Sequence, residues 1–352
     1  MSVKGNNTYK EISSQILSWD SIYNDIVENN SVNIEIFRKK YDRIIICGCG
    51  SSYNLSQSAA FFTKSIFNDI NVVATPSSEI LLNPELFINN KEQFLIIGFS
   101  RSGETTEILE VFKKFSKDDN ISTFAFSCKD NSSIVQLSDN YYFCKKATEK
   151  SIVMTVSFSS MLFAYCIILS TAFNQAILSE FKELISYMGN NFNIADKWIE
   201  NYIANNNFHN YFALGSEFNY GIALEADLKM KEMSQIPSYA YHIYEFSHGP
   251  KSLVTNKTLS IILTLSDNIF KKDYIFKELT DLNSQIIVIG HKKIARYEQN
   301  NINYIFEDCN VENDLVKSFL NVPVIQLMAY YKTVNLGLNP DLPKNLSYTV
   351  KI

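Results

Sequence analysis

Short apolar runs alternate along the chain with longer segments whose apolar residues recur at helical spacing. The runs are rich in Ile, Val and aromatic residues, as β-strands are. Strands that alternate with helices in this way are typical of parallel α/β sheets. The predicted strands are 44–47, 71–74, 94–98, 122–126 and 141–143 in the first half, and 211–214, 238–241, 260–265, 285–289 and 303–306 in the second.

The two halves follow the same rhythm, and the stretch between them, 158–207, carries apolar positions that fit helices. We therefore expect an α/β protein with two tandem doubly wound, flavodoxin-like sheets, each parallel, five-stranded and flanked by helices. A chain of 352 residues suits this number of domains. The expected segments are an N-terminal helical segment over 1–35, a first domain over 36–195 and a second over 196–352.

Composition narrows the function classes. A net charge of −5 and the absence of a basic patch argue against a nucleic-acid-binding role. The polar start lacks a signal segment, and the longest apolar stretch, 161–169, is too short to span a bilayer. We therefore expect a cytoplasmic protein that does not bind a membrane. The six cysteines lie mostly in apolar runs and lack metal-ligand spacing. Buried free thiols, no metal and no cofactor are the expectation.

Two hydroxyl-rich loops follow adjacent predicted strands. The segment Ser100–Thr106 places four hydroxyls around Gly103, directly before a helix expected near Glu104, and Ser51 and Ser52 follow the first strand. Hydroxyl and backbone donors at a helix N-terminus suit a phosphate dianion. The alternative is that these residues only cap helices. The counterpart loop of the second half, 266–269, lacks both the hydroxyl cluster and the glycine, so only one half is expected to bind phosphate.

Acid–base residues gather in the second half. Steps of four and three place Glu225, Lys229 and Glu232 on one side of a helix, and a His248-Gly-Pro turn follows shortly after. A carboxylate and a histidine are the pair that aldose–ketose chemistry requires, one to move a proton between C1 and C2 and one to open the sugar ring. The alternative is a solvated helix face beside a structural histidine.

The motifs C-G-S-S-Y-N at 49–54 and S-R-S-G-E-T at 100–105 resemble those of the sugar isomerase (SIS) domain family, and the similarity extends from about residue 40 to the C-terminus. The family includes the isomerase half of glucosamine-6-phosphate synthase, fructosamine-6-phosphate deglycases and amino-sugar-phosphate deaminases and isomerases. The resemblance implies that Glu232 is the C1/C2 base and that His248 opens the ring. It implies a homodimer with a shared active site, since in relatives this His comes from the neighbouring subunit. Phosphate would be held by Ser52, Ser100, Arg101, Ser102 and Thr105, with Ser51 beside them.

Two positions depart from the synthase pattern. Tyr348 occupies the place of the tail Lys that forms an imine with the sugar, in a tail that the resemblance places over the sugar. Of a Ser-Thr-Lys step only Thr155 remains, which is expected to contact the phosphosugar. Nothing resembling the ammonia-producing glutaminase domain precedes the sugar domains. These differences argue against amination of fructose 6-phosphate. We expect an isomerase or deaminase acting on an amino-sugar or ketosamine 6-phosphate, and the alternative is a non-catalytic phosphosugar sensor.

Overall fold

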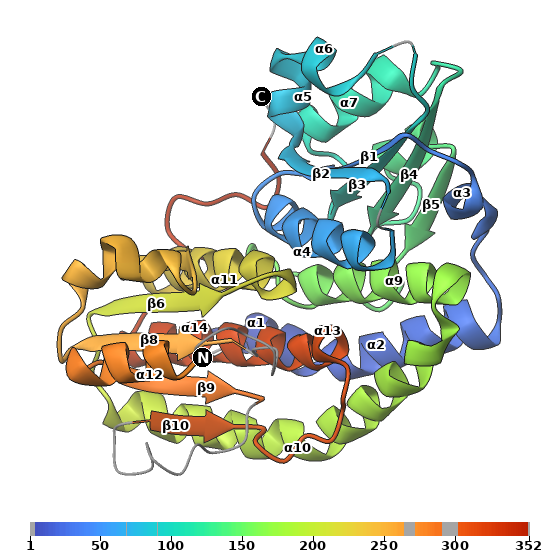
Figure 1. Ribbon diagram of the computed structural model, residues 1–352. Coiled ribbons are helices and arrows are strands. Elements are labelled where there is room, and N and C mark those ends of the chain that lie inside the picture. Colours follow the sequence, from blue (N-terminus) through green and yellow to red (C-terminus); the bar gives the residue numbers. More distant parts are fainter. Residues whose placement is uncertain (1–3, 68, 90, 264–271, 291–301, 351–352) are drawn as a thin grey trace. The chain divides into compact units, whose positions relative to one another are not determined.

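The computed structural model describes residues 4–67, 69–89, 91–263, 272–290 and 302–350. The described chain forms two compact units. The N-terminal unit consists of Ser14–Lys182 with the tail from Ser347 onward, and the C-terminal unit consists of Glu183–Leu346 with the described residues before Ser14. Each unit contains one five-stranded sheet whose strand pairs are all parallel, which confirms the predicted fold class (Figure 1).

The sheet of the N-terminal unit has the strand order β2-β1-β3-β4-β5, the flavodoxin-like order. Its strands are nearly continuous apolar runs because helices cover both faces of a parallel sheet, and every residue of β3 is buried. The strands are β1 Arg43–Gly48, β2 Asn71–Pro76, β3 Phe94–Ser100, β4 Ile121–Ser127 and β5 Asn140–Phe143. The helices are α2 Gln15–Tyr23, α3 Glu35–Arg38, α4 Ser51–Ile66, α5 Ser77–Leu82, α6 Pro84–Phe87, α7 Thr106–Phe115, α8 Ser133–Leu137 and α9 Val156–Phe173, with a π-helical turn η1 at Asn24–Glu28 and a 3-10 turn η2 at Gln175–Ile177.

Helix α9 is apolar on all sides. By length and composition alone it could cross a membrane, but 83% of it is buried inside the protein. It packs against α2 and α4, and its Phe163 stacks on Trp19 at 5.5 Å between ring centroids. A helix that is hydrophobic all round and covered on all sides is a core helix. The long helix α10, Leu178–Asn205, then leads from the N-terminal unit into the C-terminal one.

The sheet of the C-terminal unit has the order β10-β9-β8-β6-β7, which is the same topology repeated with β6 in the place of β1. Its strands are β6 Asn210–Gly215, β7 Ser238–His242, β8 Thr258–Ile262, β9 Gln285–Ile289 and β10 Ile302–Ile305. The other elements are α1 Asn6–Ser13, α11 Phe218–Lys229, η3 Met230–Ser234, η4 Glu245–His248, η5 Pro250–Leu253, α12 Lys272–Asp281, α13 Asp314–Lys317, η7 Ser318–Leu320 and α14 Asn321–Asn335.

The predicted strands all overlap observed ones, and 285–289 coincides with β9. Most predicted strands fall within the observed ones, but two extend beyond their C-terminal ends: β8 already ends at Ile262, and Phe306 lies outside β10 because its φ of +59° turns the chain. Residues 264–269, which include the loop 266–269 compared above, lie outside the described residues. Helix α7 begins at Thr106 rather than near Glu104, so the hydroxyl-rich segment forms a longer loop than expected.

Candidate functional site

The two hydroxyl-rich loops lie at the point where the strand order of the N-terminal sheet reverses. Strand β1 has β2 on one side and β3 on the other, so the loops after β1 and β3 leave neighbouring strand ends in opposite directions. Ligands of doubly wound sheets bind in the crevice at this switch point. Ser51 and Ser52 begin α4 directly after Gly50, and both are buried. The topology therefore brings the predicted phosphate loops together.

The loop after β3 is held by its own hydroxyls. Ser100 Oγ accepts a hydrogen bond from the Gly103 amide at 3.1 Å, and Ser102 Oγ accepts one from the Glu104 amide at 3.2 Å. Gly103 has a φ of +66°, and a Cβ there would lie 2.1 Å from the Ser132 hydroxyl, so no other residue fits without a shift. A hydroxyl that accepts one hydrogen bond still carries a donor hydrogen, which is what an incoming anion needs.

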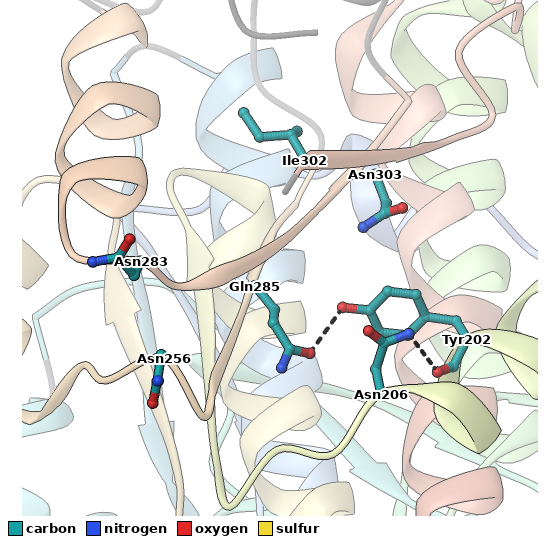
Figure 2. A pocket seen from close by; sticks show the side chains of 7 residues that line it. All are labelled: Tyr202, Asn206, Asn256, Asn283, Gln285, Ile302 and Asn303. Atoms are coloured by element: carbon teal, nitrogen blue, oxygen red, sulfur yellow. Dashed lines mark hydrogen bonds between the residues drawn. The ribbon is translucent and has the colours of Figure 1, made fainter. Parts of the chain in front are cut away.

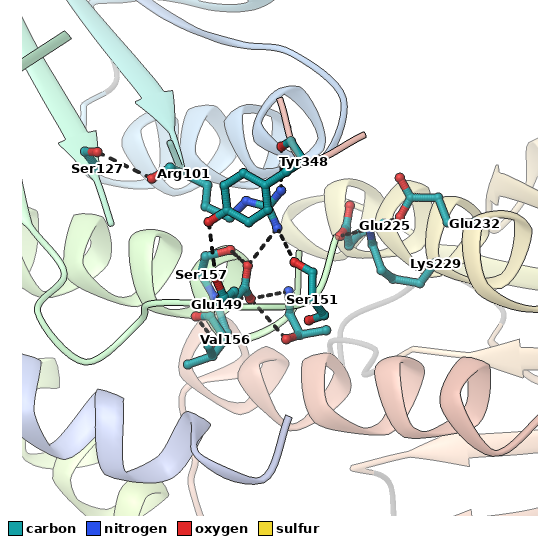
Figure 3. A network of polar contacts seen from close by, with 12 residues as sticks. Arg101, Ser127, Glu149, Ser151, Val156, Ser157, Glu225, Lys229, Glu232 and Tyr348 are labelled. Atoms are coloured by element: carbon teal, nitrogen blue, oxygen red, sulfur yellow. Dashed lines mark hydrogen bonds and ion pairs between the residues drawn. The ribbon is translucent and has the colours of Figure 1, made fainter. Parts of the chain in front are cut away.

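Arg101 is engaged within the protein rather than pointing freely into this loop. Its guanidinium pairs with Glu149 at 3.0 Å and donates to the Tyr348 carbonyl at 2.8 Å. The Tyr348 ring covers the guanidinium at 4.0 Å, a cation–π contact (Figure 3). Because both members of the ion pair are buried, the arginine charge is largely compensated by Glu149. Arg101 and the tail residue Tyr348 are thus brought together, which their sequence separation did not predict.

Glu149 is a buried carboxylate with several hydrogen-bond partners, and its role was not predicted from the sequence. It accepts hydrogen bonds from the Thr155 amide at 2.6 Å and hydroxyl at 3.0 Å, and from the Ser157 amide at 2.9 Å and hydroxyl at 2.7 Å. These donors surround the start of α9, so Glu149 caps that helix from a preceding loop. The hydroxyl of Thr155, predicted to contact the sugar, is directed at Glu149. No local motif signals this role, since the carboxylate lies six and eight residues before its partners.

The predicted acid–base helix exists in the C-terminal unit, with one difference. Helix α11 ends at Lys229 and continues as the π-helical turn η3, which carries Glu232. Lys229 Nζ lies 3.4 Å from Glu225 Oε1 and donates to Glu232 (Figure 3). The side chains of Glu225 and Lys229 are 0% exposed, whereas that of Glu232 is 20% exposed. The three residues are therefore a buried ionic group with one carboxylate reaching solvent, and not a solvated helix face.

His248 lies exposed at the end of the short helix η4, in the same unit. Gly249 follows with a φ of +140°, which confirms the predicted turn. The turn is anchored by Glu278 of α12, a second residue that the sequence analysis missed. Glu278 accepts a hydrogen bond from the Ser247 hydroxyl and one from Lys251 Nζ at 2.6 Å. Residues on both sides of His248 are thereby fixed to one carboxylate.

Thiol chemistry does not fit the site loops. All six cysteines are free. Burial raises the pKa of Cys47 to about 12 and that of Cys49, which precedes Gly50, to about 11. Both thiols therefore remain protonated and poorly nucleophilic near neutral pH. Within the described residues, no group of three or more His, Cys, Asp or Glu side chains is placed to hold a metal ion.

A second hollow lies elsewhere in the C-terminal unit. It measures about 660 Å³ and is lined at the amino ends of β9 and β10 by Gln285 and Asn303, among other amides (Figure 2). Tyr202 borders it and donates to Gln285 at 3.2 Å. Ligands of such folds bind at the carboxyl ends of the strands, and this hollow lies at the opposite edge with no acid or base among its described lining residues. Its lining therefore offers no group for acid–base chemistry among the described residues.

Comparison with known proteins places the chain in a family. The SIS domain family matches residues 36–170 and again residues 207–335, one match in each repeat. The chain is a member of the SIS domain family. Both matches include the strands and the first helix of their sheet, in agreement with the duplicated topology.

Relatives of this SIS protein are metabolic enzymes. It is 27% identical over 323 residues to the glutamine–fructose-6-phosphate aminotransferase of Campylobacter jejuni, covering 88% of this chain and 52% of that protein. The corresponding protein of Caldanaerobacter subterraneus is 27% identical, with 95% and 56% covered. The chain thus spans about half the length of the curated relatives it matches.

Solved structures share the whole fold. The glucosamine-6-phosphate deaminase of Thermotoga maritima superposes with a TM-score of 0.80 at 27% identity, covering 98% of this chain and 100% of that one. The tagatose-6-phosphate ketose/aldose isomerase of Escherichia coli gives a TM-score of 0.81 at 21% identity, with 96% and 95% covered, and shows the fold alone. The chain therefore shares its double-SIS architecture with sugar-phosphate isomerases and deaminases.

The two SIS repeats have the same backbone at the turn after their first strand. Strand β1 ends at Gly48 and β6 at Gly215, and a Cβ at either would collide with the backbone of the next helix. Two residues later, Gly50 has φ 56° and ψ −125°, and Glu217 has φ 56° and ψ −129°. The second repeat thus holds a glutamate in a conformation that glycine favours.

Proposed function

We propose that this SIS protein is an aldose–ketose isomerase or deaminase that acts on an amino-sugar or ketosamine 6-phosphate. The proposal is carried chiefly by the ionic group of Glu225, Lys229 and Glu232. Lys229 lies between two carboxylates, and its contact with Glu232 orients the member of the group that reaches solvent. Among the relatives, the deaminase of Thermotoga maritima acts on glucosamine 6-phosphate by name and supports this substrate class.

In the proposed reaction Glu232 is the base. Its carboxylate takes the proton from C2 of the open-chain sugar, the electron pair of that C–H bond forms the C1–C2 double bond, and the carbonyl oxygen at C1 gains a proton. Glu232 then returns the proton to C1 while the hydroxyl or amine at C2 gives up a proton to water, which forms the C2 carbonyl or imine and completes the shift from aldose to ketose. If C2 carries an amine, the resulting C2 imine is hydrolysed by water and releases ammonia. Glu225 is the second carboxylate partner of Lys229, and His248 moves the proton that opens the ring.

The phosphate would bind between the loops after β1 and β3. Ser51, Ser52, Ser100 and Ser102 contribute hydroxyls, and Thr105 precedes α7 as its N-terminal cap residue. Because Glu149 compensates the charge of Arg101, most of the attraction for the dianion would come from hydroxyls, amides and the starts of α4 and α7. Arg101 would act mainly as the anchor of the tail through Tyr348, which has no amine with which to form an imine.

We further propose a cytoplasmic homodimer in which His248 of one subunit serves the site of its partner. The exposure of His248 and the anchoring of its turn by Glu278 favour a residue presented to another surface. The aminotransferase reaction of the longer relatives is not proposed for this chain, because Tyr348 stands where the synthase pattern has a lysine.

Solvent deuterium exchange tests the proposal. Wild type and Glu232→Gln are incubated in heavy water with the 6-phosphates of glucosamine, galactosamine, fructose and tagatose and with fructose–amino-acid adducts, and proton spectra are recorded. We expect one sugar to lose its C1 or C2 proton signal with wild type, and a loss in rate of at least about a hundredfold with the variant, the lower range for a general base. The product spectrum separates isomerase from deaminase from deglycase. Binding without exchange by wild type would indicate a phosphosugar sensor instead.

A further inference from the structure

A recess of about 410 Å³ lies along α10 in the C-terminal unit, where the chain leaves β10. Aromatic side chains from two elements line it: Tyr187 and Trp198 belong to α10, and Tyr304 and Phe306 belong to β10 and the turn after it. The volume is in the range of small-molecule sites. Aromatic rings attract cations over their faces, and four such rings border this recess, with Trp198 stacked on Tyr202 at 5.1 Å between centroids.

Carboxylates complete the recess. Glu307 and Asp308 follow Phe306 and line it, and none of its described lining residues is basic. The Tyr187 hydroxyl donates to Asp308 at 2.6 Å, and its ring meets that of Phe306 edge-on at 5.9 Å between centroids. Burial first, and then the Asp308 carboxylate, raise the pKa of Tyr187, in keeping with a negative local potential. Aromatic faces and carboxylates on one concave surface are complementary to an organic cation.

The backbone at the recess is strained. Phe306 has a φ of +59°, a region that bulky residues rarely adopt, and its side chain is nevertheless buried. This turn directs the chain from β10 so that the next two residues line the recess. Conformations of this kind persist where the surroundings enforce them, and they cluster at ligand clamps. The aromatic residues, the carboxylates and the strained turn thus belong to one recess.

We propose that this recess binds a small organic cation, an ammonium or guanidinium group, between its aromatic rings and carboxylates. The site is separate from the proposed chemistry within the same unit. Helix α11 packs against β6 and β7, at one edge of the sheet, whereas the recess lies beside β10 at the other edge. The proposal does not depend on the reaction assigned to Glu232.

Trp198 provides a direct probe, since the chain has only two tryptophans and Trp19 is fully buried in the N-terminal unit. Choline and its neutral isostere 3,3-dimethylbutan-1-ol are titrated into Trp19→Phe while fluorescence is followed. Calorimetric titration of the unsubstituted protein guards against effects of the Trp19 substitution. We expect a saturable response to choline and at least about fivefold weaker binding of the alcohol, within the range of a cation–π contact.

Variants that remove one charge test whether the carboxylate of Asp308 contributes to cation binding. Asp308→Asn can still accept from Tyr187 but removes one negative charge, and it should weaken choline binding roughly fivefold, the upper range for an exposed ion pair. Asp119→Asn, an exposed carboxylate in the other unit, is the matched control and should change nothing. A capped Gly-Lys-Gly peptide is titrated in parallel. Tighter binding of the peptide than of choline would assign the cation to a protein side chain, and the reverse would assign it to a free amine.

Several results would overturn the proposal. Equal binding of choline and the alcohol would show a merely apolar recess. Equal effects of Asp308→Asn and Asp119→Asn would show that the carboxylate is not involved. Absence of a saturable response by both methods would remove the site altogether. A change in Trp198 fluorescence with protein concentration alone would show that a second copy of the chain covers the recess.

Discussion

The strained position Glu217 allows a sharp test of how the two repeats differ. Glu217 and Gly50 occupy equivalent turns, and their φ and ψ angles agree within 4°. A side chain at such angles costs on the order of 1–3 kcal/mol. Glycine relieves that cost but adds about 0.5–1 kcal/mol of conformational entropy in the unfolded chain. We therefore expect Glu217→Gly to stabilise the C-terminal unit by about 1 kcal/mol.

The assay is differential scanning calorimetry, in which the two units can be followed as separate or overlapping transitions. For a unit of this size, about 1 kcal/mol corresponds to a rise in Tm of roughly 2–4 °C. Glu217→Ala is the control, because it removes the exposed carboxylate but keeps the Cβ and hence the strain. Gly50→Ala is the reciprocal change. A Cβ at Gly50 meets nothing within 4 Å, so its cost would come from the backbone alone.

Two results would contradict the assignment of strain to the backbone of Glu217, and the same variants distinguish them. If Glu217→Ala stabilises the protein as much as Glu217→Gly, the carboxylate and not the backbone is unfavourable. If Gly50→Ala leaves the Tm of the N-terminal unit unchanged, the turn does not disfavour a side chain. The difference between Gly50 and Glu217 would then have no effect on stability. A rise in Tm with a loss of exchange activity would indicate that the strain has a catalytic use, as it often does at active sites.

Two further predictions concern single residues. Glu278→Gln should lower kcat and increase amide hydrogen exchange over 245–253, because the turn that carries His248 loses its anchor while the global fold persists. Burial raises the pKa of Glu278, but hydrogen bonds from Lys251 and Ser247 outweigh it and leave the pKa below its usual value. The anchor is therefore complete above about pH 4.3 and weakens as pH falls through the lower folded-state value, so acid should loosen the turn in wild type and have no such effect in the variant. Burial, followed by Asp341, raises the pKa of Tyr330 to about 12 from its ordinary value of 10.0. Its contribution to stability is complete below pH 10 and is lost as pH rises toward 12. Tyr330→Phe should therefore lose less stability than wild type between about pH 10 and pH 12 in urea unfolding, and equal losses would contradict the assignment.

The strands were predictable because both sheets are parallel and covered on both faces. Each strand then reads as a short apolar run, as in the fully buried β3, and the helices between them keep a different period. The turn at Gly249 was predictable from its own residues. Glu149 and Glu278 were not, because each is defined by partners that only the folded chain brings near it. Glu278, for example, lies 31 residues from Ser247.

The same reason explains why the protein partners of Arg101 could not be read from the sequence. In the sequence it belongs to a loop of hydroxyls, and a cation beside a proposed phosphate suggests a direct contact. The structure shows that its guanidinium already has a carboxylate, a carbonyl and an aromatic face as partners. Exchanging these for a phosphate would leave Glu149 buried without its cationic partner, held only by the donors at the start of α9, and breaking a buried ion pair costs several kcal/mol. The stable arrangement is one in which Glu149 holds both the start of α9 and Arg101, and Arg101 in turn holds Tyr348. A ligand in the hydroxyl-rich loops would then bind through neutral donors, and the arginine would connect those loops to the tail.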